Sequence, residues 1–403
     1  MRILVVSDQW FPDFAGGSAR VATEIARRLA RRGHELDVIV PRGHEGQPSE
    51  ETAPGLRIIR ALPRGRLPQT IADTVYSYVS TRRLGARYDV LLAHQATTAV
   101  GAARALPGVP LALVFHASAS RESQFTRTRL RSGTRRLAAL ALEPLLRDLE
   151  RAALSRAAAV LSLSDFSSSL ILEDAPGCRG RIVRVSGGVD VSSFTPDYEN
   201  ARTRRGVAAG VTQLLTVRRL EPRMGLEALL QAFAAIRTPQ LRLAIAGAGP
   251  LAAELRELID TLRLDGSAML LGRVSEEELR DWYRAADLFV LPTAAYEGFG
   301  LATVEALASG TPVVGTPVGA TPEILGPLSP DLVAAGTDPD ALAAAIGRGL
   351  QAIGPEFRAR CRSYACRHFD WEHVTDDWEA ALHAVRPVST SGTRAHAFPP
   401  ALR

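Results

Sequence analysis

The chain has 403 residues, of which 46% are hydrophobic, and it carries a formal net charge of +5 at pH 7. This length is enough for two or three domains with a large buried core, and the composition fits a soluble globular protein. All 48 basic residues are Arg, which excludes a Walker-type phosphate loop and a pyridoxal phosphate enzyme, because both need a Lys.

The remaining composition narrows the class further. No apolar run approaches the roughly 20 residues that span a bilayer, and the apolar start is too short for a signal peptide, so we expect a cytoplasmic protein. Cys178, Cys361 and Cys366 give no disulfide framework, and no His joins them in a pattern typical of a metal site. The Arg excess is not interleaved with aromatic residues, so we expect a solvated basic surface and no nucleic-acid partner.

The first half of the chain alternates apolar strands with amphipathic helices. "RILVVS" from Arg2 predicts a buried strand, and the segment from Gly16 to Gly33 predicts a helix whose apolar residues recur on one face. Further strands are predicted for ELDVIV from Glu35, YDVLLAH ending at His94, PLALVFH ending at His116, AAVLSLS and RIVRV.

A second unit with the same alternation starts near residue 211. Its predicted strands are TQLLTV, LRLAIAG, AMLLG, DLFVLP and PVVGT, and its predicted helices include Gly225 to Ile236 and Pro250 to Leu264. We interpret the polar, Gly-rich stretch from Ser186 to Gly210 as the linker between the halves. The pattern predicts an α/β protein with parallel sheets and helices on both faces. The expected divisions are a first domain (1–190), a linker (191–210), a second domain (211–370), a last helix (371–386) and a disordered tail (387–403).

Ligands of open α/β sheets bind beyond the carboxyl ends of the strands, so the loops after the strands hold the candidate site. Gly16 and Gly17 begin a helix after the first strand, where amides without a neighbouring Cβ suit a phosphate, although an ordinary Gly-rich helix start fits equally well. His116 ends a strand and could bond a sugar hydroxyl, although a structural His is the commoner case.

The segment "YEGFGLATVEALASGTPVV" is the most specific part of the chain. Glu297 and Glu305 are separated by seven residues and flank a Gly-rich helix start, where a nucleotide diphosphate would find both free amides and carboxylates. A carboxylate can accept paired hydrogen bonds from the vicinal hydroxyls of a ribose. The Gly-rich loop is Gly298, Phe299 and Gly300, and the outward amides would be those of Phe299, Gly300 and Leu301.

A basic cluster follows the strand "TQLLTV". Arg218, Arg219 and Arg223 precede the helix that begins near Gly225, and the forked guanidinium of Arg suits a phosphate. The segment "RESQFTRTRLRSGTRR" from Arg121 is also rich in Arg and could meet an anionic membrane or a phosphorylated acceptor, or could be a basic loop.

Two other motifs have simpler explanations. "GAGPLA" from Gly247 resembles a dinucleotide-binding fingerprint, but it follows the second strand of its unit and not the first. "DPD" from Asp338 has the letters of a metal-binding motif, but Asp338 as N-cap and Pro339 at the first helical position explain it better. We therefore expect no NAD and no metal.

Six segments together resemble the family-4 retaining glycosyltransferases, whose GT-B fold has two facing Rossmann-like domains with a cleft between them. The resemblance covers roughly residues 1 to 385 and is most specific in the second half. The segments are GGSARVATEIARRLARRGHELDV, GGVDVSSFTP, TVRRLEPRMGLEALLQAF, LAIAGAGPL, LLGRVSEEELRDWYRAADLFVLPTAAYEGFGLATVEALASGTPVV and GATPEIL.

The resemblance implies a role for each candidate residue. At the donor phosphates, the Gly16–Gly17 loop approaches and Arg219 neutralises the charge. His116 contacts the transferred sugar, and Glu297 lies beside the sugar ring. Glu305 holds the ribose, and the loop ending at Val274 meets the base. The last helix, around Trp371 to Val385, would cross back onto the first domain. The chain departs from the family at Met224, where a basic Lys is usual, and in milder ways at "GGVD" and at Gly319–Ala320.

The expected function is transfer of a sugar from a UDP- or GDP-sugar to a hydroxyl acceptor, with retention and without metal or cofactor. Cell-envelope glycan, glycolipid or natural-product biosynthesis would be the setting, in the cytoplasm or at the inner face of the membrane. A nucleotide-sugar epimerase of the same fold and a catalytically degenerate binding subunit are the alternatives. We expect Arg223 to join Arg219 in the phosphate clamp, with Met224 packed inward.

Overall fold

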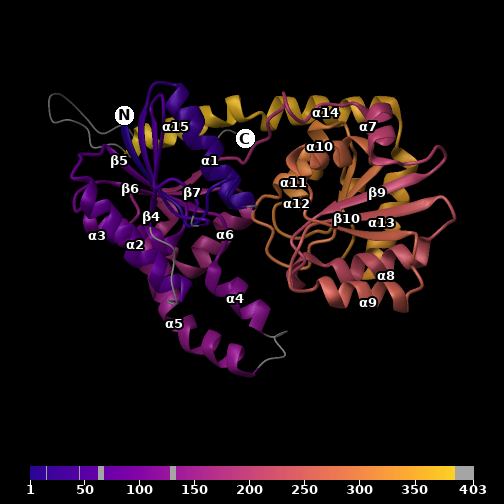
Figure 1. Ribbon diagram of the computed structural model, residues 1–403, viewed down its shortest axis with the longest axis horizontal. Coiled ribbons are helices and arrows are strands. Elements are labelled where there is room, and N and C mark those ends of the chain that lie inside the picture. Colours follow the sequence, from indigo (N-terminus) through magenta and orange to yellow (C-terminus); the bar gives the residue numbers. More distant parts are fainter. Residues whose placement is uncertain (15, 45, 62–67, 128–132, 386–403) are drawn as a thin grey trace.

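The computed structural model describes residues 1–14, 16–44, 46–61, 68–127 and 133–385, which form two α/β units (Figure 1). The first unit, drawn from indigo to magenta, is built on an eight-stranded sheet, and the second, drawn from pink to orange, on a five-stranded sheet. The predicted α/β class with two parallel sheets is confirmed. The predicted disordered tail lies outside the described residues.

The first sheet has the strand order β3-β4-β2-β1-β5-β6-β7-β8 and is parallel except for the antiparallel pair β3–β4. Its strands are β1 (Arg2–Val6), β2 (Glu35–Pro41), β3 (Glu50–Ala53), β4 (Leu56–Ala61), β5 (Val90–Ala93), β6 (Leu111–Phe115), β7 (Ala159–Ser162) and β8 (Ile182–Arg184). Its helices are α1 (Gly17–Arg31), α2 (Gln69–Leu84), α3 (Ala96–Ala105), α4 (Ala119–Arg127), α5 (Gly133–Arg156) and α6 (Asp165–Asp174), with the 3-10 helix η1 (Pro176–Arg181).

The second sheet has the order β11-β10-β9-β12-β13, with every neighbouring pair parallel. Its strands are β9 (Thr212–Val217), β10 (Leu241–Ala246), β11 (Ala268–Gly272), β12 (Leu288–Leu291) and β13 (Val313–Gly315). The helices of this half are α7 (Tyr198–Arg205), α8 (Leu226–Ile236), α9 (Ala252–Thr261), α10 (Glu276–Ala285), α11 (Leu301–Ala308), α12 (Thr321–Leu325), α13 (Pro339–Ala352), α14 (Pro355–Phe369) and α15 (Trp371–Val385), with the 3-10 helices η2 (Pro222–Met224) and η3 (Pro330–Leu332).

The apolar runs of the sequence became strands because helices pack on both sides of each sheet. Every residue of β12 is fully buried, and so are the last four residues of β1. The apolar face of α1 is buried as the spacing predicts, with Val21, Ile25 and Leu29 at most 2% exposed. Because the strands themselves are apolar and buried, the polar residues of the candidate site lie at the carboxyl ends of the parallel strands.

Three elements differ from the sequence prediction. Neither strand of the antiparallel pair β3–β4 was predicted: all four residues of β3 are exposed and carry no apolar pattern, and the largely buried β4 was overlooked. The stretch that we expected to be an irregular linker contains α7, which packs on α10. Arg204 of α7 binds both carboxylate oxygens of Asp281 at 2.7 and 2.8 Å, so polar contacts, and not an apolar face, hold this helix in place.

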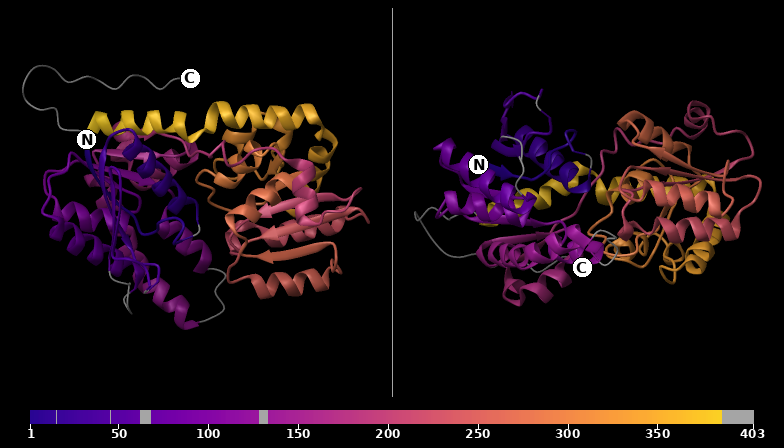
Figure 2. Two further views of the ribbon diagram at one scale, coloured as in Figure 1. Left: turned by 45° about the horizontal axis from the view of Figure 1, so that its top comes forward. Right: turned by 60° about the horizontal axis from the view of Figure 1, so that its bottom comes forward.

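The last two helices run along one side of both units (Figure 2). α14 packs on α11 of the second unit, and α15 packs on α1 of the first. Trp378 of α15 is fully buried and donates from Nε1 to the carbonyl of Ser186 at 2.9 Å. Arg28 and Arg32 of the first unit also form ion pairs with α15. Among the described residues, no helix is both long and apolar enough to cross a membrane.

Candidate active site

The two units meet at the loop before α11, where a first-unit carbonyl leaves no room for a side chain. A Cβ added at Gly298 would lie 2.3 Å from the carbonyl oxygen of His116, and one added at Gly187 would lie 2.6 Å from the ring of Phe299. Both distances are shorter than any real Cβ contact, so these glycines permit the close approach. The ends of β6 and β12 therefore converge on one site.

The N-terminus of α11 has no side-chain cap among the described residues. Its N-cap is Gly300, in the left-handed conformation at φ 89°, which favours glycine. A Cβ on Gly17 would lie 3.8 Å from Leu301 Cδ1, so the start of α1 faces the start of α11. Two helix N-termini without side-chain caps thus lie close together, an arrangement that favours an anion.

Glu297 is buried next to this helix start. Its Oε2 accepts hydrogen bonds from Arg218 Nη2 at 2.7 Å and from Thr293 Oγ1 at 2.9 Å. Burial alone would raise the pKa of Glu297, but the Arg218 guanidinium and the Thr293 hydroxyl outweigh it and hold that pKa below its usual range. Glu297 is therefore an anion at neutral pH. Tyr296, just before it, has a positive φ of 57°, a strained conformation of the kind found at functional sites.

Glu305 lies on the second turn of α11 and is also buried. It accepts a hydrogen bond from Tyr283 Oη at 2.9 Å and pairs with Arg20 Nε at 3.6 Å. Arg20 comes from α1 of the first unit and donates from Nη2 to both oxygens of Glu276 at 2.7 Å. Burial raises the pKa of Glu305, with Arg20 acting in the opposite sense. The sequence did not single out Arg20, whose partners lie far away in the chain.

The three arginines before α8 have different surroundings. Arg218 is buried against Glu297, whereas the side chain of Arg219 is 50% exposed and pairs with Glu221 at 3.0 Å. Arg223 reaches the first unit, where its Nη2 lies 3.1 Å from Glu122 of α4, and its Nη1 donates to the Tyr296 carbonyl. Glu122 lies in the Arg-rich segment that the sequence singled out, but only the arginines of that segment were considered, so this contact with Arg223 was missed.

His116 lies at the end of β6, stacked on a second histidine. Its Nε2 is 3.0 Å from Nδ1 of His94, and the ring centroids are 5.3 Å apart. Burial lowers the pKa of His116 to about 4, and burial together with His116 lowers the pKa of His94 well below its usual range. Both rings are therefore neutral at pH 7, and His116 can donate or accept a hydrogen bond without bringing charge.

The segment expected to meet the base follows β11. Val274 is partly buried and stands just before Ser275, which caps α10 in a reciprocal capping box with Glu278. Glu276, in the first turn of the same helix, carries the bidentate bond to Arg20. The beginning of α10 is therefore fixed both by its cap and by the first unit.

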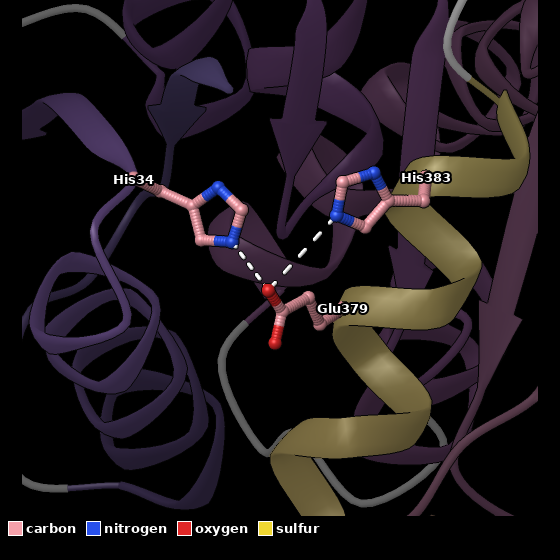
Figure 3. Close-up of side chains that lie close together, drawn as sticks. All are labelled: His34, Glu379 and His383. Atoms are coloured by element: carbon pink, nitrogen blue, oxygen red, sulfur yellow. Dashed lines mark hydrogen bonds and ion pairs between the residues drawn. The ribbon is translucent and has the colours of Figure 1, made fainter.

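One group of three possible metal ligands occurs among the described residues, and it lies where α15 meets the first unit (Figure 3). His34 Nε2 is 2.7 Å and His383 Nε2 is 3.9 Å from Glu379 Oε1. The other oxygen of Glu379 pairs with Arg32 at 3.0 Å. The cluster serves as a polar tie between α15 and the first unit. Asp338 caps α13 by accepting from the amide of Ala341, as expected.

Known protein families match both halves of the chain. Residues 15–193 match the family described as Glycosyltransferase Family 4, and residues 197–368 match Glycosyl transferases group 1. A D-inositol 3-phosphate glycosyltransferase of Pseudarthrobacter chlorophenolicus is 30% identical over 325 residues, which cover 76% of this chain and 75% of that protein.

Solved structures resemble the chain over nearly its whole length. Sucrose-phosphate synthase from Thermosynechococcus elongatus superposes with a TM-score of 0.78 at 23% identity, covering 95% of this chain and 98% of that one. Anabaena HepE in complex with UDP-glucose gives a TM-score of 0.72 at 19% identity, covering 95% of this chain and 99% of that one. At these identities the likeness shows a shared fold.

Proposed function

Because the chain belongs to the family-4 glycosyltransferases and has their GT-B fold, we propose that it transfers a sugar from a UDP- or GDP-sugar to a hydroxyl acceptor with retention of configuration. The observation that carries the proposal is the uncapped N-terminus of α11, which lies between Glu297 and Glu305 and close to the start of α1. A diphosphate fits such a place because amides and dipoles from two helices favour its charge.

The donor would lie along α11. Its diphosphate binds the amides of Gly300 and Leu301 and approaches Gly16 and Gly17, and the positive charge of Arg219 and Arg223 offsets its negative charge. The ribose hydroxyls bond Glu305, which is held ready by Tyr283 and which Arg20 neutralises before the donor arrives. The base meets the loop ending at Val274.

In the reaction, the bond between the anomeric carbon and the phosphate oxygen breaks, and a bond from the acceptor oxygen forms on the same face. The acceptor proton passes to the departing diphosphate, so a protein nucleophile is not required. Glu297 lies beside the sugar as a fixed anion, and neutral His116 bonds a sugar hydroxyl. Catalysis then depends on positioning and on charge stabilisation of the leaving group without a metal.

The acceptor would enter from the first unit. A cavity of about 250 Å³ lies beside Tyr296, between α4 and α5, and is lined by polar groups that include Arg121, Gln124 and Glu150. The relatives named D-inositol 3-phosphate glycosyltransferase make an inositol phosphate the first acceptor to test. Peripheral contact with an anionic membrane through the Arg121–Arg136 segment stays part of the proposal; residues 128–132 of it lie outside the described residues.

The test is a transfer assay with purified protein. UDP- and GDP-sugars are incubated with a panel of hydroxyl acceptors, with and without excess EDTA, and the anomeric configuration of the product is read by NMR. We expect transfer with retention at an undiminished rate in EDTA. An inverted product would overturn the retaining mechanism, and activity that only Mg²⁺ or Mn²⁺ restores would overturn the metal-free one.

The same assay separates the alternatives. An epimerase would convert the donor when no acceptor is present, whereas the proposed transferase needs the acceptor. A degenerate binding subunit would bind a nucleoside diphosphate and transfer no sugar to any acceptor in the panel.

A further inference from the structure

The guanidinium of Arg218 is buried at the carboxyl end of β9 with part of its bonding capacity unused. Nη2 contacts Glu297 Oε2 at 2.7 Å and Thr293 Oγ1 at 2.9 Å. Nε is fully buried, and no acceptor among the described residues lies within hydrogen-bond distance of it. A buried donor without a partner is destabilising, so an acceptor from outside the chain would be bound favourably here.

Met224 supplies the second observation. It is 4% exposed, and its Sδ lies 2.9 Å from Nη2 of Arg218. The side chains of positions 218 and 224 therefore reach the same point, one from the end of β9 and the other from η2, just before α8. A cation at position 224 would lie against the Arg218 guanidinium and be repelled by it. The point where these two side chains meet accommodates one positive charge, and in this chain Arg218 provides that charge.

The two neighbouring arginines are engaged elsewhere. Arg219 is half exposed and pairs with Glu221, and the two terminal nitrogens of Arg223 contact Glu122 and the Tyr296 carbonyl. Arg218 is the one held by Glu297, the residue directly before the Gly298–Gly300 loop. The charge of Arg218 is thus fixed beside the uncapped start of α11. Glu297 and Thr293 hold the Arg218 side chain in place before a ligand arrives.

We propose that Arg218 is the cation that binds the donor diphosphate and stabilises it as it leaves, in the place of a basic residue at position 224. The inference rests on the proposed function, because it assigns a residue to that same donor site. It changes the expected clamp: Arg218 makes the close contact, and Glu297 positions Arg218 in addition to lying near the sugar.

The test moves the charge from one position to the other. Arg218→Gln removes the charge but keeps a donor for Glu297, and we expect nucleoside diphosphate affinity and kcat to fall by about a hundred- to a thousandfold, the size found when one donor to developing charge is removed. Affinity for the plain nucleoside should not change, because the nucleoside has no phosphate. Adding Met224→Lys to Arg218→Gln should restore at least about a tenth of the lost affinity and rate, since the ammonium would reach the same point.

Controls separate binding from folding. Arg256→Gln, on the exposed side of α9, should behave as wild type, and Met224→Leu added to Arg218→Gln should restore nothing. Should Arg218→Gln fail to fold, Arg218→Lys keeps the charge but removes Nε, and it should bind the diphosphate at least about tenfold less tightly, the ~1.4 kcal/mol of a modest charged hydrogen bond.

Three results would overturn the inference. A folded Arg218 variant with normal diphosphate affinity and kcat is one. A double variant whose melting temperature recovers while its diphosphate affinity does not is another, because Arg218 would then only neutralise Glu297. If the wild-type chain binds no nucleoside diphosphate, the proposed function itself fails and the assignment of Arg218 falls with it.

Discussion

The helices that face each other across the units, α1 and α11, both begin with glycines, but for different reasons. At α11, Gly300 has a positive φ, and a Cβ at Gly298 would lie 2.3 Å from the His116 carbonyl. At α1, Gly16 is extended, and a Cβ on Gly17 would make an ordinary contact at 3.8 Å. The backbone thus requires the glycines of α11, whereas a Cβ at Gly17 of α1 meets no close contact. The start of α11 is therefore more constrained sterically than position 17.

The largest effect should come from Glu297→Gln. This substitution keeps the shape but removes the anion beside the sugar and loosens Arg218, so kcat should fall by about a thousandfold, within the range of a group that acts in the transition state. Nucleoside binding should survive. Glu254→Gln, at an exposed position of α9 outside the candidate site, is the matched control. Turnover of the Glu297 variant within a few-fold of wild type would remove this residue from the chemistry.

The glycine comparison predicts the next effect. Gly298→Ala should push the α11 loop from the His116 carbonyl and lower kcat/KM by about a hundredfold, the effect of misplacing reacting groups by about 1 Å. Gly17→Ala should lower it by less than about tenfold, or ~1.4 kcal/mol. Steady-state kinetics of both variants checks the contrast. Equal losses would mean that the start of α1 is as constrained as that of α11.

Glu305→Ala should act mainly on donor binding. Its carboxylate would hold the ribose in both the ground and the transition state, so KM should rise by about ten- to a hundredfold with a smaller fall in kcat, in keeping with about 1.5–3 kcal/mol for bonds to a charged group. Donor titration by calorimetry gives the affinity. An unchanged donor Kd would place the ribose elsewhere on the second unit.

The smallest effect is expected for Glu379, which links α15 to His34 and Arg32 of the first unit. Burial would raise the pKa of Glu379, but hydrogen bonds from His34 and Arg32 hold it below its usual range. Its stabilisation is therefore present above the unfolded pKa of about 4.3 and lost as the pH falls through the lower folded value. Glu379→Gln should lower the free energy of unfolding by about 1 kcal/mol or less at pH 7, because the pair is partly exposed.

Melting curves at neutral and acid pH check this tie. The difference between wild type and Glu379→Gln should shrink as the pH falls below about 4, where the wild-type carboxylate also becomes protonated. The exposed Glu257→Gln on α9 should show no such dependence. A difference that grows toward acid would contradict the direction of the pKa shift.

The sequence predicted most of the fold, because the fold depends on local patterns. Apolar runs mark the buried strands, and the glycines around Phe299 mark the start of α11. The exposed β3 and the Arg-rich α7 have no such pattern and were missed.

The partners within the site depend on the tertiary fold. Arg20 meets Glu305 across the two units, and Arg223 meets Glu122. Adjacent residues of an extended segment point to opposite sides, so Arg218 is buried where Arg219 is exposed, and the sequence alone does not tell which side faces inward.

A crystal structure of the chain with a bound nucleoside diphosphate tests the central claim most directly. We expect phosphate oxygens within about 2.7–3.2 Å of the amides of Gly300 and Leu301, with the ribose on Glu305 in place of Arg20. A diphosphate bound away from the start of α11, with the Arg20–Glu305 pair still intact, would contradict it.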